Sequence, residues 1–129
     1  MGGRLLLDTS VVIALFQKDP AAEQLVTGGG ERFLPVPALG ELYLGVPRSR
    51  RPDLALAQIT SLAATIRILP CDAGTARIYG DIKHDLWAKG RPIPENDMWI
   101  GAIARRHGLT VATRDRHFSE IGGLATVAW

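Results

Sequence analysis

The hydrophobic residues of this chain follow two patterns, short continuous runs and longer stretches with a helical repeat. Short apolar runs are typical of strands in a parallel sheet that is covered on both faces. We expect such strands at residues 4–7, 32–36, 67–69, 109–112 and 125–127. Pro35 has no amide proton to donate to a neighbouring strand, so the second of these strands should lie near an edge of the sheet.

Helices are expected between these runs, because apolar residues recur there at helical spacing and helix-start and helix-stop residues flank them. The predicted helices cover residues 11–16, 21–26, 37–46, 54–66, 72–89 and the stretch from Pro94 to Gly108. The last helix is apolar around almost its whole circumference and should be buried. Strands that alternate with helices predict a three-layer α/β fold with a mostly parallel central sheet of four to five strands.

Length and composition fit one globular domain. The chain has 129 residues, of which 47% are hydrophobic and 22% are charged, enough for a core of its own. Its apolar runs are too short to span a membrane, and its first residues lack the pattern of a signal peptide. The single cysteine fits a reducing compartment. We therefore expect a single domain at residues 1–129, located in the cytoplasm and not in a membrane.

Four acidic residues occupy positions that would bring them together. Asp8 and Asp115 each follow a predicted strand, and Asp97 lies in the first turn of the last predicted helix. Glu41 stands within an otherwise apolar helix, where an acid is costly unless it is paired or coordinated. Helix N-termini and the carboxyl ends of strands share one edge of such a sheet, so at least Asp97 and Asp115 should face one crevice.

A cluster of carboxylates calls for a cation, because two carboxylates about 5 Å apart repel each other by roughly 3 kcal/mol at an effective dielectric constant near 20. Oxygen-rich sites suit Mg²⁺ or Mn²⁺, and the hydroxyls of Thr113 or Ser10 could contribute. Such a site activates a metal-bound water for attack on a phosphodiester. Taken singly, Asp8 and Asp97 are more simply explained as helix caps and Asp115 as a turn residue. Only their joint placement favours a metal site.

Four segments of the chain carry a family resemblance. They read Leu-Leu-Leu-Asp-Thr-Ser-Val-Val-Ile (5–13), Pro-Ala-Leu-Gly-Glu-Leu-Tyr-Leu-Gly-Val (37–46), Asn-Asp-Met-Trp-Ile-Gly-Ala-Ile-Ala (96–104) and Thr-Arg-Asp-Arg-His-Phe (113–118). In this order they resemble the PIN-domain ribonucleases, and most of all the VapC-like toxins of bacterial and archaeal toxin–antitoxin pairs. The resemblance spans essentially the whole chain.

The resemblance implies a PIN-like α/β/α fold and Mg²⁺- or Mn²⁺-dependent endonuclease action on RNA. The implied metal-binding and catalytic acids are Asp8, Glu41, Asp97 and Asp115. The implied supporting hydroxyls are those of Thr113, Ser10 and Thr9. Members of this family commonly form homodimers and are silenced by a small VapB-like antitoxin whose tail enters the active-site groove.

Basic residues recur near the predicted acidic edge, where they would hold the phosphates of an RNA strand. The candidates for RNA binding are Arg48, Arg91, Arg114 and Arg116. Arg114 and Arg116 flank Asp115 directly, although any one of these arginines is as well explained as a solvated surface residue. The histidines have no metal-ligand spacing and are expected at the surface: His84, His107 and His117.

Two other functional classes fit parts of this pattern. A catalytically silent partner-binding domain could keep the PIN fold, but it would have no reason to retain all four acids. A phosphatase or a receiver domain is a weaker alternative, because Ser10 stands where the phosphatase has a second acid and no lysine follows Lys89 for the receiver. The apolar residues of 54–66 spread over more than one helix face and predict either core or a dimer or antitoxin interface.

Overall fold

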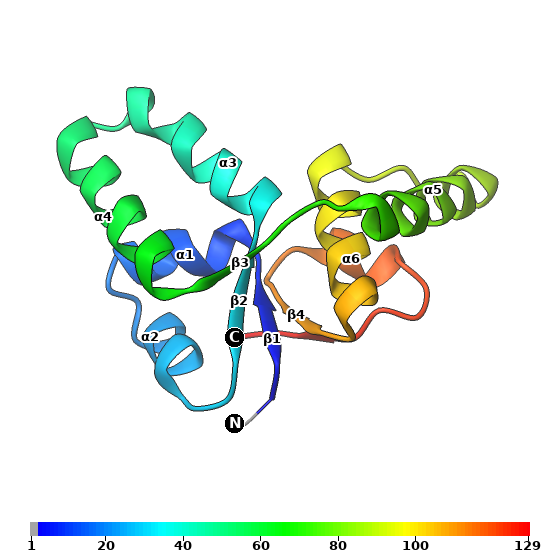
Figure 1. Cartoon of the computed structure of the whole chain (residues 1–129), viewed down its shortest axis with the longest axis horizontal. Coiled ribbons are helices and arrows are strands. Elements are labelled where there is room, and N and C mark those ends of the chain that lie inside the picture. The colour runs from blue at the N-terminus through cyan, green and yellow to red at the C-terminus, as the bar shows by residue number, and fades with distance from the viewer. Residues whose placement is uncertain (1–2) are drawn as a thin grey trace.

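The computed structural model describes residues 3–129 and contains a five-stranded sheet in the order β3-β2-β1-β4-β5 (Figure 1). The strands are β1 (Leu5–Leu7), β2 (Arg32–Pro35), β3 (Arg67–Leu69), β4 (Thr110–Ala112) and β5 (Thr126–Val127). Every neighbouring pair of strands is parallel. The prediction of a mostly parallel sheet of four to five strands is therefore confirmed.

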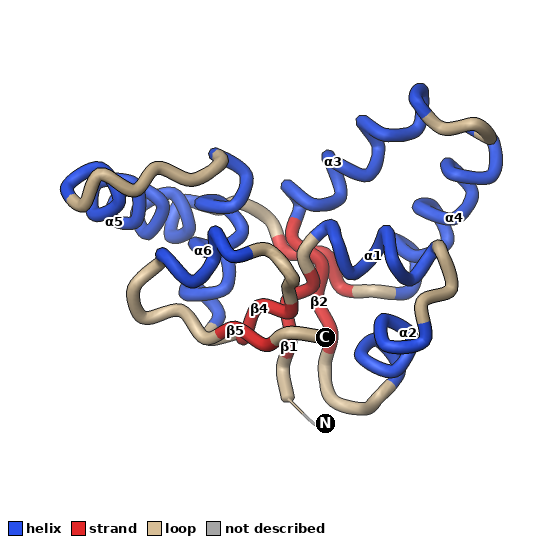
Figure 2. The backbone as a smooth tube through the Cα atoms, turned by 180° about the vertical axis from the view of Figure 1, so that it is seen from behind, coloured by secondary structure: helices blue, strands red, loops and turns tan. Residues whose placement is uncertain are grey.

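Helices lie on both sides of this sheet. One side carries α1 (Thr9–Phe16), α2 (Pro20–Thr27), α3 (Val36–Gly45) and α4 (Pro52–Thr65), and the other carries α5 (Ala73–Ala88) and α6 (Glu95–His107). Figure 2 shows the same division from behind. Two short 3-10 helices are η1 (Val46–Arg48) and η2 (Arg116–Glu120). This three-layer arrangement agrees with the prediction from the sequence. None of the helices within residues 3–129 is long and apolar enough to cross a membrane.

The direction in which successive strands are added to the sheet changes at β1. The chain runs outwards from β1 to β2 and β3, and then passes through α5 and α6 to β4 on the other side of β1. In a parallel sheet, the carboxyl ends of the two strands at such a reversal open a crevice in which ligands bind. β1 and β4 pair in register, with Leu7 opposite Ala112. The residues that follow, Asp8 and Thr113, therefore lie side by side at this edge.

The central strands and the middle of α6 lie at the centre of the core, because their sequences are almost entirely apolar. The three leucines of β1 are at most 2% exposed. Every residue from Ile100 to Ala104 in α6 is buried, as the sequence predicted for this helix. Gly108 ends α6 in the left-handed conformation, with φ of 65°, which glycine adopts without steric strain.

Two local features differ in detail from the sequence predictions. β2 was predicted near an edge because of Pro35, and it lies second from the edge, paired with both β1 and β3. Pro35 is the last residue of β2, beyond the part that pairs with β1, so its missing amide proton disrupts little. The helix predicted at 37–46 begins at Val36 and ends at Gly45, and η1 follows it. Pro47 explains this ending, because proline cannot donate the next helical hydrogen bond.

Candidate active site

Hydrogen bonds fix Asp8 at the carboxyl end of β1. Its Oδ1 accepts from the backbone N–H of Val11 at 3.2 Å and from the hydroxyl of Ser10 at 2.6 Å, so Asp8 caps α1. Its Oδ2 accepts from the hydroxyl of Thr113, the residue that follows β4. Asp8 is only 4% exposed. It is thus a helix cap, as the simpler interpretation held, and also a buried carboxylate turned towards the end of β4.

Thr113 connects Asp8 to the last of the predicted acids. Its hydroxyl donates to Asp8 and accepts from the backbone N–H of Asp115 at 2.8 Å. The hydroxyls of Thr113 and Ser10 therefore both contact Asp8, while their support of a metal site stays a prediction. The hydroxyl of Thr9 is buried and makes no hydrogen bond in the part of the chain that the structure describes.

Asp97 and Asp115 meet at the side chain of His117. Asp97 lies in the first turn of α6, and Asp115 caps η2 by accepting the backbone N–H of His117 at 2.9 Å. Nδ1 of His117 is 2.8 Å from Oδ1 of Asp115 and 3.1 Å from Oδ2 of Asp97. One ligand atom from each of the three side chains lies within 4.8 Å of the other two. The predicted meeting of Asp97 and Asp115 at one edge of the sheet is therefore observed.

The charges at this edge repel one another. The pKa of Asp97 is raised from 3.8 to about 7, first by burial and then by the charge of Asp115, while the contact with His117 opposes the rise. Burial also raises the pKa of Asp8 above 3.8, against the hydrogen bonds from Ser10 and Thr113, and the charge of Asp115 adds to this rise. The fold thus holds these acids at a cost in free energy whenever they are all ionised.

Asp115 and His117 stabilise each other's charged forms. Burial alone would raise the pKa of Asp115, but hydrogen bonds from the His117 backbone, from Asp97 and from the His117 ring outweigh it and hold that pKa below 3.8. Burial alone would lower the pKa of His117, but the hydrogen bonds and charges of Asp115 and Asp97 raise it above 6.5. The imidazolium of His117 therefore balances part of the negative charge.

The groups gathered here suit a divalent cation. Asp97, Asp115 and His117 present two carboxylates and one ring nitrogen close enough to ligate one ion. Asp8 lies outside this group, but the charge of Asp115 acts on it. Carboxylate oxygens are the ligands that Mg²⁺ and Mn²⁺ prefer. A cation at this point would also relieve the repulsion that raises the pKa of Asp97. The residues present therefore fit such an ion.

Glu41 stands apart from this close group. It is half-buried in α3, which begins directly after β2 at the same edge of the sheet. It lines a cavity of about 280 Å³ among side chains of α1, α3 and α4, including Ile13, Phe16 and Leu42. Among residues 3–129, the ligand atoms that approach one another within 4.8 Å do not include its carboxylate. The place of Glu41 in a metal site stays a prediction.

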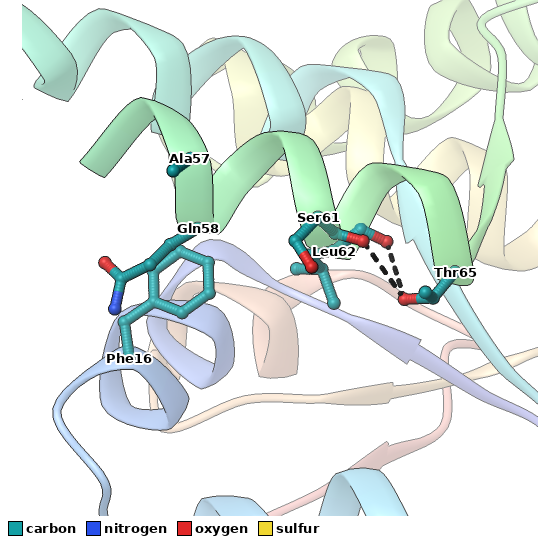
Figure 3. Close-up of a pocket in the computed structure, with 6 residues that line it drawn as sticks. All are labelled: Phe16, Ala57, Gln58, Ser61, Leu62 and Thr65. Atoms are coloured by element: carbon teal, nitrogen blue, oxygen red, sulfur yellow. Dashed lines mark hydrogen bonds between the residues drawn. The ribbon is translucent and has the colours of Figure 1, made fainter. Parts of the chain in front are cut away.

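A second cavity, of about 440 Å³, lies between the end of α1 and α4 (Figure 3). Its lining residues are Phe16, Ala57, Gln58, Ser61, Leu62 and Thr65. The hydroxyl of Thr65 donates to the carbonyls of Ser61 at 3.4 Å and Leu62 at 3.0 Å, so it is committed to its own helix. The lining carries no charged side chain, and the cavity therefore offers no groups for phosphodiester chemistry.

The four arginines predicted to bind RNA have different surroundings. The guanidinium of Arg114 lies 3.4 Å from the ring centroid of Trp129, and its Nε donates to the Trp129 carbonyl at 2.8 Å. Arg91 makes an ion pair with Glu120 of η2 at 3.3 Å. The guanidinium groups of Arg48 and Arg116 are exposed and have no hydrogen bond or ion pair among the residues that the structure describes. Of the four predicted arginines, only Arg48 and Arg116 thus have a guanidinium group without a partner among residues 3–129.

His117 is the member of the site that sequence reasoning missed. It does lie at the surface, with 48% of its side chain exposed, but its ring contacts two of the predicted acids. The available signal was its position two residues after Asp115. An aspartate commonly accepts the backbone N–H of the second residue after it, and this turn brings that residue back towards the carboxylate.

Comparison with known proteins agrees with this geometry. A sequence profile of the PIN domain family matches residues 5–124. The chain is 33% identical over 129 residues to the tRNA(fMet)-specific endonuclease VapC of Shigella flexneri, with 98% of both chains covered. It is 32% identical to Ribonuclease VapC5 of Mycobacterium tuberculosis, with 95% of this chain and 90% of that protein covered.

Solved structures give the same result. DNA-bound VapBC from Salmonella typhimurium superposes with a TM-score of 0.86 at 28% identity, covering 100% of this chain and 99% of that one. VapBC-5 from Mycobacterium tuberculosis superposes with a TM-score of 0.75 at 33% identity, covering 98% of this chain and 97% of that one. The chain therefore belongs to the PIN domain family, and its relatives there are the VapC ribonucleases.

Proposed function

We propose that this chain is a metal-dependent endoribonuclease of the VapC type, a single PIN domain that cleaves RNA in the cytoplasm as the toxin of a toxin–antitoxin pair. The observation that carries the proposal is the meeting of partly buried acids at one edge of the sheet, which together with burial raises the pKa of Asp97 to about 7. An ordinary helix cap has no need of such crowding. Relatives named as ribonucleases, at 30% identity or more, support the activity.

Each acid has its own part in this proposal. Asp8 is held by hydroxyls from both sides and offers a fixed carboxylate, while Asp97 in α6 and Asp115 at the start of η2 would hold the ion. Mg²⁺ or Mn²⁺ supplies the positive charge that polarises the phosphate and lowers the pKa of a water molecule. Thr113 keeps Asp8 and Asp115 at a constant spacing through its hydroxyl. Glu41 would add a fourth carboxylate to this site from α3.

Arg48 and Arg116 are the proposed contacts to the RNA phosphates. Both guanidinium groups are exposed and unengaged within residues 3–129. Arginine contacts to phosphate hold a strand in place without reading its sequence. Arg114 has a different part, because its stacking on Trp129 anchors the segment that carries Asp115. Arg91 binds RNA only if it leaves its acidic partner in η2.

A VapB-like antitoxin and a second copy of the chain are the proposed protein partners. The related VapBC-5 from Mycobacterium tuberculosis is a member of a family of toxin–antitoxin systems. Large apolar side chains are exposed on α1, α3 and α4, with Leu44 at 66%. Leu44→Glu should weaken whichever association this surface makes. Light scattering with and without a VapB-like antitoxin measures both associations. A 14.0 kDa monomer under all conditions would contradict them.

A cleavage assay separates this proposal from the catalytically silent alternative. Total cellular RNA is incubated with the protein in Mg²⁺, in Mn²⁺ or in EDTA, beside Asp97→Asn. We expect discrete fragments that vanish in EDTA and with the variant, because EDTA removes the ion and the variant removes one of the carboxylates that would hold it. If the wild type neither cleaves RNA nor binds Mn²⁺ by calorimetry, the partner-binding alternative replaces the enzyme.

A further inference from the structure

His117 is directed at the two acids that approach each other most closely. Its Nδ1 lies 2.8 Å from Oδ1 of Asp115 and 3.1 Å from Oδ2 of Asp97. The position is set by the backbone, because the Asp115 carboxylate also accepts the N–H of His117 at 2.9 Å and so turns the chain back on itself. The ring is therefore held beside both carboxylates although 48% of the side chain is exposed.

These distances match the spacing of ligand atoms round one ion. In an octahedral site with bonds of about 2.1 Å, adjacent ligand atoms are about 3.0 Å apart and opposite ones about 4.2 Å. Nδ1 of His117 stands at the adjacent spacing from one oxygen of each acid, and the three ligand atoms all lie within 4.8 Å of one another. Replacement of the bridging proton by an ion requires only small movements of Asp97, Asp115 and His117.

We propose that His117 binds the divalent ion through Nδ1, together with Asp97 and Asp115, and makes the site favour Mn²⁺ over Mg²⁺. This inference rests on the proposed nuclease function and adds a nitrogen ligand to its acidic site. Mg²⁺ takes oxygen ligands almost exclusively, whereas imidazole suits transition metals. Two carboxylates with one imidazole therefore discriminate between the two ions more strongly than carboxylates alone.

The competing possibility is an imidazole that only fills the place of the ion and swings into solvent when the ion arrives. The two cases differ in whether nitrogen is bonded to the metal. Mn²⁺ is paramagnetic, so pulsed electron paramagnetic resonance detects a coordinated nitrogen directly, without RNA and without any measurement of activity. The protein is used as the full chain with any purification tag removed, because tag histidines would themselves bind Mn²⁺.

The experiment compares the wild type with His117→Asn and with His84→Asn. His84 is an exposed histidine of α5 outside the acidic cluster, so its variant is the matched control. We expect nitrogen modulation of the Mn²⁺ echo in the wild type and in His84→Asn, and its loss in His117→Asn. Labelling histidine with heavy nitrogen should change the modulation frequency of the wild type, so the result does not depend on how well a variant folds.

Calorimetry of the same proteins measures the selectivity. The dissociation constant for Mg²⁺ divided by that for Mn²⁺ should fall about tenfold or more in His117→Asn and stay unchanged in His84→Asn. Loss of a group that merely hydrogen-bonds a metal ligand already lowers metal affinity about tenfold, so loss of a ligand should do at least as much. An unchanged ratio would overturn the selectivity. Mn²⁺ bound to the wild type without nitrogen modulation would overturn the assignment of His117 and leave the nuclease proposal intact. A wild type that binds no Mn²⁺ would overturn both.

Discussion

Replacing Asp97 by asparagine should stabilise the protein at about pH 8 in metal-free buffer. The pKa of Asp97 is about 7 in the fold, against an ordinary value of 3.8. The folded state therefore holds this proton more tightly than the unfolded chain. The associated stability is complete below pH 3.8 and is lost as the pH rises through about 7. Asparagine has no charge at any of these pH values, so Asp97→Asn avoids the loss.

The structure sets the size of this effect. A pKa rise from 3.8 to about 7 corresponds to at most about 4 kcal/mol, at about 1.4 kcal/mol per pH unit. That pKa already includes the opposing contact with His117, but the Asp97 side chain is 14% exposed, so water screens part of the repulsion. A negative charge in the first turn of α6 also contributes about 0.3–1 kcal/mol of favourable interaction with the helix dipole, which asparagine forfeits. We expect a net gain of about 1–2 kcal/mol, or roughly 3–8 °C in Tm.

Thermal unfolding followed by circular dichroism in EDTA, from about pH 5 to about pH 8, measures this gain. The difference between Asp97→Asn and the wild type should be smallest at the acid end and should grow as the pH rises to about 7. Asp53→Asn is the control, because Asp53 occupies the first turn of α4 but is exposed and outside the cluster. A variant less stable than the wild type at about pH 8 would make Asp97 a structural cap and refute the repulsion argument.

Three further substitutions test other parts of the site. Thr113→Val should lower the free energy of unfolding by about 1–3 kcal/mol in urea titrations, because the Asp8 carboxylate and the Asp115 N–H lose the hydroxyl that they share. Thr113→Ser retains a hydroxyl and should keep most of that stability. Glu41→Gln should reduce kcat about tenfold or more at an unchanged Tm if its carboxylate reaches the ion, and an unchanged kcat would remove Glu41 from the site. Arg116→Ala should raise KM and lower the salt dependence of RNA binding by about one unit of slope, and a smaller effect is expected for the ion-paired Arg91.

The layers of the fold and the edge that carries the acids could be predicted because both depend on local patterns. The apolar run that forms β1 is too uniform to be anything but buried, and Asp8 follows it directly. Asp97 lies in the first turn of α6 and Asp115 shortly after the end of β4, and the topology of the sheet brings such positions to one edge. Pro35 was less informative, because a proline at the very end of β2 leaves the pairing of that strand intact.

The contacts within the site depend on tertiary geometry that no local pattern contains. Whether Glu41 reaches the ion depends on the angle at which α3 leaves the sheet, and its sequence of apolar neighbours does not encode that angle. His117 reaches Asp97 only because η2 packs against α6. Arg114 was a natural candidate for RNA binding from its place beside Asp115, yet its partner is Trp129, distant by fifteen residues in the sequence.

The central claim is that these acids direct water onto an RNA phosphate with the help of a divalent ion. The most direct test is mass spectrometry of the fragment ends that form at early times in isotopically labelled water with Mn²⁺. Hydrolysis predicts linear phosphate ends that carry one labelled oxygen, and no fragments with Asp97→Asn or in EDTA. Unlabelled cyclic phosphate ends that form equally well in EDTA would contradict the account, because they arise when the RNA's own 2′-hydroxyl attacks the phosphate without a metal ion.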